Sequence, residues 1–80
     1  MNSFQNLLDF LARLQATKIH YTLAHFREET ISVEIAVPGE RWEVEFFADG
    51  GVDVEVFTSS GQGELEGVEA FSRLFATHGA

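Results

Sequence analysis

The chain of 80 residues has no cysteine and a single proline. Without cysteine there is neither a disulfide nor a thiolate metal site to hold the fold, which fits a reducing cytoplasm. No apolar run approaches the roughly 18 residues that a membrane-spanning helix requires. The first residues also lack the basic region and small-residue cleavage site of a signal peptide. We therefore expect one cytoplasmic domain, residues 1–80, without membrane association.

Basic residues are also scarce: five lysines and arginines stand against 13 aspartates and glutamates, for a net charge of -8. This balance disfavours nucleic acid and anionic membranes as direct partners. It favours a basic protein partner, or it simply keeps the protein soluble. Apolar residues, in contrast, are plentiful, because 45% of the chain is hydrophobic and eight residues are phenylalanine. That content predicts a globular core and argues against disorder.

Two segments have the apolar spacing of helices, and four segments between them alternate like strands. The predicted helices span residues 4–16 and 64–77, and the predicted strands span 19–26, 30–37, 41–48 and 52–58. Connections this short join only antiparallel neighbours. The predicted fold class is therefore α+β, a two-layer sandwich in the order helix, four-stranded antiparallel meander (strand order 1-2-3-4), helix. Both helices are expected on one sheet face.

Turn lengths determine which strand residues lie opposite each other, and a slip of one residue would exchange the two sheet faces. Pro38-Gly39 suits a two-residue turn, and Asp49-Gly50-Gly51 suits a three-residue loop. The predicted pairs are Leu23 with Val33, Val33 with Val44, Phe46 with Val54, and Val44 with Val56. All of these choices place the aliphatic residues on one face, which we term the inner face.

The opposite, outer face has no helix left to cover it and carries an unusual set of residues. We predict it as the partner-binding site, made of Phe26, Glu34, Glu43, Glu45, Phe47, Asp53, Glu55 and Phe57. Glu45 is expected opposite Glu55, and Glu34 opposite Glu43, although facing like charges destabilise a sheet. Aromatic anchors among carboxylates are typical of a surface that binds a basic protein. One alternative is that the phenylalanines are scattered surface residues without a binding role. Another is a homodimer that buries this face, although the carboxylates of the two copies would then repel each other.

No pattern in the sequence predicts catalysis, a cofactor or a metal site. The three histidines, His20, His25 and His78, have no metal-ligand spacing, and His25 is expected to be a structural residue. Asp49, Asp53 and Glu55 do not form a calcium loop. Gly61-Gln62-Gly63 lacks the lysine of a phosphate-binding loop, and acidic residues follow it. We therefore expect a non-enzyme, although a deep pocket between helices and sheet would favour a small ligand.

The segment from Tyr21 to Phe57 resembles small uncharacterised bacterial proteins that share its Val37-Pro38-Gly39-Glu40-Arg41-Trp42-Glu43-Val44-Glu45-Phe46-Phe47 core, followed by Asp49-Gly50 and Val52 to Phe57. That resemblance implies no activity. In size, acidity and lack of catalytic residues the chain is similar to immunity proteins, which neutralise bacterial polymorphic toxins. This likeness carries over no toxin-contacting residues. Our hypothesis is that the outer face docks a basic toxin domain, such as a nuclease, with Phe47 and Phe57 as anchors. The alternative is a homo-oligomeric or scaffold interaction module.

Overall fold

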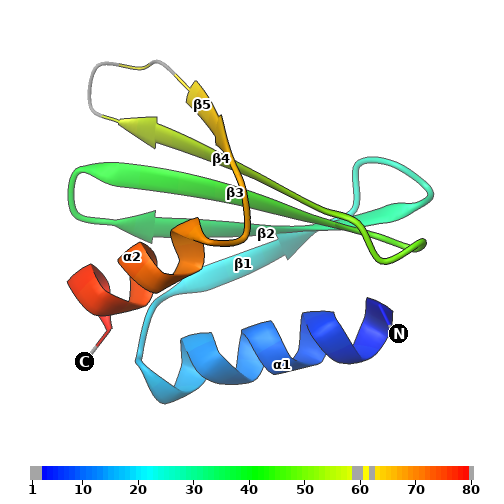
Figure 1. The fold of residues 1–80 in the computed structure, drawn as a ribbon, viewed down its shortest axis with the longest axis horizontal. Coiled ribbons are helices and arrows are strands. Elements are labelled where there is room, and N and C mark those ends of the chain that lie inside the picture. Colours follow the sequence, from blue (N-terminus) through cyan, green and yellow to red (C-terminus); the bar gives the residue numbers. More distant parts are fainter. Residues whose placement is uncertain (1–2, 59–60, 62, 80) are drawn as a thin grey trace.

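The computed structural model describes residues 3–58, 61 and 63–79, and it is an α+β fold with two helices and a five-stranded antiparallel sheet. The helices are α1 (Ser3–Ala16) and α2 (Ala70–His78). The strands are β1 (Tyr21–Ala24), β2 (Thr30–Val37), β3 (Glu40–Phe47), β4 (Val52–Thr58) and β5 (Gly63–Glu66). They lie side by side in the order β1-β2-β3-β4-β5 (Figure 1). Each strand therefore neighbours the one that precedes it in the chain.

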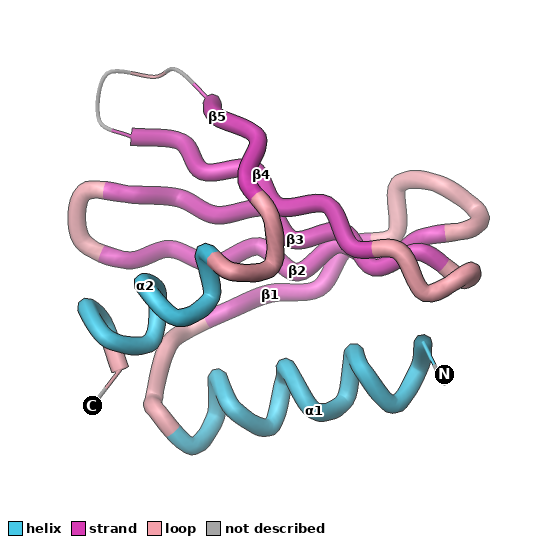
Figure 2. Tube along the Cα trace, in the orientation of Figure 1, coloured by secondary structure: helices cyan, strands magenta, loops and turns pink. Residues whose placement is uncertain are grey.

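The hydrophobic core lies between the inner face of the sheet and both helices. Trp42, in the middle of β3, is fully buried, as are Leu14 of α1 and Leu74 of α2. A single cluster joins these side chains, so both helices cover the same sheet face (Figure 2). Period-two alternation in β2, β3 and β4 sends every second side chain into this cluster. The other side chains of these strands form the uncovered outer face.

The register of the first two strand pairs is confirmed. Leu23 lies opposite Val33, and Val33 lies opposite Val44. The tight turn between β2 and β3 requires a left-handed residue, and Gly39 supplies it with a φ of 81°. Turn chemistry and side-chain alternation therefore specify the same alignment.

The predicted pairing of β3 with β4 is wrong by two residues. Phe46 lies opposite Val52, and Val44 lies opposite Val54. The hairpin closes one residue earlier than expected, because the Phe47 amide donates to the Gly51 carbonyl at 2.9 Å. The amide of Ala48 is thereby freed for a bond to Glu29 in the neighbouring loop, at 2.8 Å. A shift of two residues keeps each side chain on its predicted face.

The first predicted strand, residues 19–26, is too long at both ends. Ile19 lies in the turn that follows α1, where its amide donates to the Leu14 carbonyl at 3.0 Å instead of pairing with β2. His25 and Phe26 lie in the loop after β1, and both are exposed. The expectation of a structural, inward-pointing His25 is therefore wrong. Its ring instead lies at the surface, 3.5 Å from the Glu28 carbonyl.

The predicted second helix is wrong in its first half, where the chain forms β5. Glu64-Leu65-Glu66 alternates as a strand, and Gly67 would make a helix that included it about 1 kcal/mol less stable than alanine would. β5 pairs with residues 54–57 of β4, which would otherwise present an unpaired edge. Leu65 and Val68, both within the predicted helix of residues 64–77, are 82% and 53% exposed. The buried residues of α2 are instead Ala70, Leu74 and Phe75, which lie on one side of the helix.

Lys18 adopts a left-handed backbone conformation, with a φ of 60°, directly after α1. In this position its amide donates to the Gln15 carbonyl at 3.2 Å and helps to cap the helix. A side chain raises the energy of this conformation by roughly 1 kcal/mol. We expect Lys18→Gly to increase the free energy of unfolding by about 0.5–1 kcal/mol in urea denaturation. Lys18→Ala retains Cβ and should give no such gain; an equal gain would contradict the explanation.

Candidate functional site

Three glutamates lie side by side across the outer face, on three neighbouring strands. Glu34 of β2 lies opposite Glu43 of β3, and Glu43 lies opposite Glu55 of β4. The first pair is confirmed. The predicted pair of Glu45 with Glu55 is wrong, because Glu45 lies opposite Asp53 after the two-residue shift. Like charges on adjacent strands repel one another, so this row weakens the sheet unless something else contacts it.

Glu45 is engaged within the molecule by Arg27, from the loop after β1. The guanidinium binds both carboxylate oxygens, at 2.6 and 3.1 Å, and the Thr30 hydroxyl donates a third bond at 2.9 Å. The hydrogen bond from Arg27 is the main reason why the pKa of Glu45 is lowered. Arg27 also lies over the Phe47 ring, 5.2 Å from its centroid. Sequence reasoning missed this cluster because Arg27 lies 18 residues from Glu45.

Phe57 is also covered from within the molecule. Arg41 lies 4.5 Å from the centroid of its ring and 3.7 Å from the Glu43 carboxylate. On the neighbouring strand, Phe57 pairs with Gly63, where an added Cβ would lie 2.7 Å from the ring. Both predicted anchors, Phe47 and Phe57, are therefore half-buried under arginines.

The centre of the outer face is a hollow of about 160 Å³, which we call the acidic hollow. Its lining residues are Phe26, Ser32, Glu43, Glu45, Asp53, Glu55 and Leu65. The structure thus brings together five of the eight predicted site residues. Phe26 and Leu65, its two apolar members, are 73% and 82% exposed. Leu65 was missed as a site residue because its segment was assigned to a helix.

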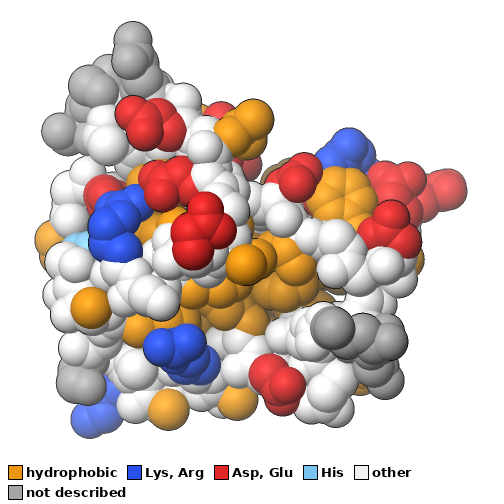
Figure 3. Space-filling view, in the orientation of Figure 1, with side chains coloured by type: hydrophobic (Ala, Val, Ile, Leu, Met, Phe, Trp, Pro, Cys, Tyr) orange, Lys and Arg blue, Asp and Glu red, His pale blue; other side chains and the backbone are white. Residues whose placement is uncertain are grey.

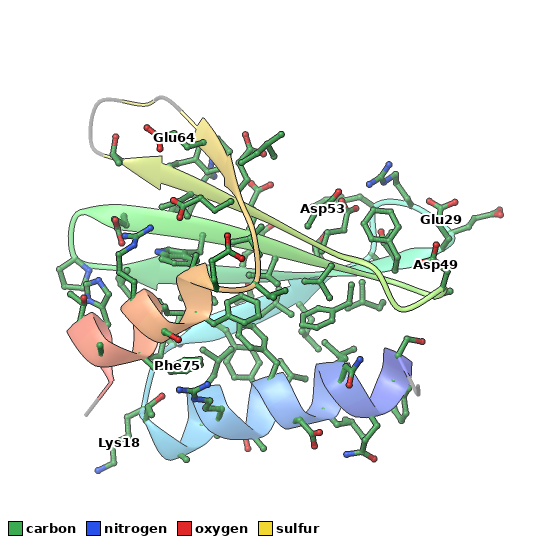
Figure 4. All side chains as sticks on the ribbon, viewed as in Figure 1. Lys18, Glu29, Asp49, Asp53, Glu64 and Phe75 are labelled. Atoms are coloured by element: carbon green, nitrogen blue, oxygen red, sulfur yellow. The ribbon has the colours of Figure 1, made fainter. Side chains whose placement is uncertain are left out.

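Further carboxylates lie toward one end of the sheet, beyond the hollow itself. Asp53 lies toward the same end of the sheet as Glu29 and Asp49, whereas Lys18 lies at the opposite corner of the molecule (Figure 4). The predicted site has five carboxylates. Among the described lysines and arginines, only Arg27 and Arg41 form salt bridges with them. The face therefore keeps a net negative charge.

A second, apolar cleft of about 310 Å³ opens on the helical side of the molecule. Figure 3 shows its orange hydrophobic side chains at the centre of the view, above α1. Its apolar lining residues are Phe10, Phe46, Val52, Val68 and Phe71. The two helices therefore leave part of the inner face open to solvent.

A polar network that the sequence did not predict joins β3, β5 and α2. Arg73 donates to Glu40 at 3.0 Å and to Glu66 at 2.9 Å. The indole of the buried Trp42 donates to Glu40 at 3.1 Å. Burial alone would raise the pKa of Glu40, but the hydrogen bonds from Trp42 and Arg73 bring it below its usual value. The network therefore holds the start of β3 to α2 through ionised Glu40.

This network predicts how stability depends on pH. Because the folded pKa of Glu40 is lowered, ionised Glu40 stabilises the fold above the usual carboxyl range, and this contribution is lost as pH falls through the lowered pKa. We expect Glu40→Gln to unfold in less urea at neutral pH and to lose less stability between about pH 6 and about pH 3. Glu28→Gln, in an exposed loop, is the matched control. Parallel pH profiles for wild type and Glu40→Gln would contradict this role.

Among residues 3–58, 61 and 63–79, no group of three or more His, Cys, Asp or Glu side chains is placed to hold a metal ion. Neither of the two described helices has the length and apolarity to cross a membrane. No protein-family model, curated protein or solved structure matches the chain.

Proposed function

We propose that the protein binds a basic protein partner through the acidic hollow and the carboxylates around it. The observation that carries the proposal is the combination of Glu43, Asp53 and Glu55 with two exposed apolar walls. A lysine or arginine of the partner would place its charged group among the carboxylates. Its aliphatic stem would lie along Phe26 and Leu65, because long basic side chains bury their stems while their heads stay polar.

The arginines already on this face support the proposal. Arg27 binds Glu45 through two hydrogen bonds while it lies over Phe47, and Arg41 lies over Phe57. The face therefore accommodates guanidinium groups both on its carboxylates and on its rings. Glu34, Asp53 and Glu55 have no described salt bridge and supply the charge that would steer a basic partner.

The partner class that we favour is a bacterial toxin domain with a basic active-site surface, such as a nuclease. An enzyme that binds nucleic acid is basic where it contacts phosphates. An acidic protein that covers this surface would exclude the substrate. The protein would thus act as an immunity-type protein by occlusion, with no catalysis of its own.

Co-expression with a toxin domain encoded beside this chain tests the proposal. We expect the wild type to protect cells, and Glu43→Arg with Glu55→Arg to abolish protection and to weaken binding in vitro by about 100-fold or more. The control with the same charge change is Glu28→Arg with Glu64→Arg, at exposed sites outside the hollow. No protection by the wild type, or equal loss in both double variants, would refute the proposal.

The apolar cleft supports a second candidate function, the binding of a small apolar ligand. Its volume of about 310 Å³ lies within the range of small-molecule sites, and phenylalanines form much of its wall. A titration with medium-chain fatty acids, followed by NMR, would test it. We expect shifts at Val68 and Phe71 that Val68→Asp abolishes. Shifts that survive this substitution would rule out the cleft as the site.

A further inference from the structure

The two edges of the described sheet differ in charge. β5, at one edge, carries Glu64 and Glu66, and Glu69 follows it. β1, at the other edge, is Tyr21-Thr22-Leu23-Ala24 and carries no charged side chain. Edge strands present unpaired main-chain groups, and charged side chains commonly protect them from other strands. The β5 edge has this protection, whereas the β1 edge lacks it.

The side of α1 that faces β1 is apolar. At about 100° per residue, Phe4, Leu8 and Gln15 lie within about 40° of one another around the helix. Gln15 donates a hydrogen bond to the Tyr21 hydroxyl of β1 at 2.8 Å, which identifies this side as the one toward β1. Phe4 and Leu8 are 64% and 41% exposed there. An uncharged stripe therefore runs along the helix beside the unprotected edge.

Leu23 of β1 continues this apolar stripe. Its partner in β2, Val33, is fully buried, so Leu23 lies on the inner face, yet it is 53% exposed. The core thus reaches Tyr21 of β1 but does not cover Leu23. We call Phe4, Leu8, Tyr21 and Leu23, together with the outer main chain of β1, the β1 edge surface.

The charge around this surface selects its occupant. At one end of the surface, Phe4 lines a hollow with Glu28 and Glu29, whereas Lys18 and His20 precede β1 at the other end. Antiparallel pairing with a second copy would bring the Lys18 and His20 end of one copy toward the Glu28 and Glu29 end of the other, so that opposite charges meet despite a net charge of -8 on each copy. We infer that the protein forms a symmetric dimer in which β1 pairs antiparallel with β1 of a second copy. The two five-stranded sheets then become one continuous sheet.

The geometry of antiparallel pairing makes this inference specific. Directly opposite residues share a sheet face, so inner-face residues of one copy oppose inner-face residues of the other. With the two-fold axis at the middle of β1, Leu23 opposes either Leu23 or Tyr21 of the second copy. Either register covers the half-exposed leucine and pairs the free main-chain groups. A two-fold contact also closes, whereas β1 paired with β5 would continue from copy to copy.

Sedimentation velocity between about 1 and 100 μM tests the dimer, since standard-sized interfaces commonly bind in or below this range. We expect the wild type to be dimeric and Leu23→Lys to raise the dissociation constant at least 100-fold. Leu65→Lys, at the equally accessible opposite edge, is the matched control and should leave the dimer intact. Added salt should strengthen the dimer, because it screens repulsion between two acidic chains.

Several outcomes would overturn the inference: a wild type that is monomeric throughout, a dimer that resists Leu23→Lys, or a larger assembly that both lysine variants disrupt and salt weakens. Circular dichroism checks that Leu23→Lys is folded, and Leu8→Lys on the helix provides a second disruption of the same surface. The inference is independent of the proposed function. Glu43→Arg with Glu55→Arg should leave the dimer intact, so failure of one proposal does not affect the other.

Discussion

Trp42→Ala is expected to remove about 3–5 kcal/mol from the free energy of unfolding, the usual loss when a buried tryptophan is truncated. Domains have about 5–15 kcal/mol in total, and one of 80 residues lies toward the lower end. Trp42 has no exposed surface and is the largest side chain in the core between α1, α2 and the sheet. Much of the variant population should therefore be unfolded near physiological temperature.

Two effects combine at this position, and Trp42→Phe separates them. Alanine leaves a large cavity and also deprives Glu40 of the indole hydrogen bond, whereas phenylalanine loses the same bond but leaves a much smaller cavity. We expect Trp42→Phe to lose about 1–2 kcal/mol, well below the loss in Trp42→Ala. Urea unfolding followed by circular dichroism measures both, because the chain has no second tryptophan for fluorescence. Equal losses in the two variants would show that the cavity contributes little.

The inner face could be predicted from the sequence because two independent signals agree there. Alternation along β2 and β3 marks the buried positions, and the Pro38-Gly39 turn independently specifies the same alignment of Val33 with Val44. A one-residue error would have exposed every aliphatic side chain in both strands. Alternation does not specify the register of the β3–β4 hairpin in this way, because a shift of two residues leaves each side chain on the same sheet face. Its loop chemistry allowed either closure.

The outer face could be predicted only in part, because its contacts join residues that are distant in sequence. Alternation placed Glu34, Glu43 and Glu55 on one face and thereby indicated an acidic surface. It gave no sign that Arg27 would reach Glu45 from a loop, since long flexible side chains have no periodic pattern. Side-chain alternation predicts which sheet face a residue occupies. Ion pairs between residues distant in sequence determine which carboxylates remain available to a partner.

The fifth strand was missed because its stability comes from pairing rather than from its own residues. Gly63–Glu66 has no buried side chain, and two of its four residues are glutamates, which favour helix over strand. Only the open edge of β4 makes an extended conformation favourable for this segment, through main-chain hydrogen bonds. This edge is a property of the assembled sheet, so no window of the sequence contains it.

Gly63→Val should therefore release β5, even though valine favours strands. A Cβ at position 63 would lie 2.7 Å from the Phe57 ring and would also collide with the Glu55 carboxylate. The ring would have to move away from β5, and overpacking of this kind costs about 1–3 kcal/mol. We expect faster hydrogen exchange at the amides of residues 54–57 that bond to β5. Exchange in β2 should stay slow, because its neighbours are unchanged.

Leu65→Val is the matched control, because it introduces the same side chain two residues away, at a site that is 82% exposed. It should leave exchange in β4 unchanged. Loss of β5 would also remove Leu65 from the wall of the acidic hollow and Glu66 from Arg73. Gly63→Val should therefore weaken binding of a basic partner while every carboxylate of the hollow remains. Normal binding together with fast exchange in β4 would show that the hollow functions without its β5 wall.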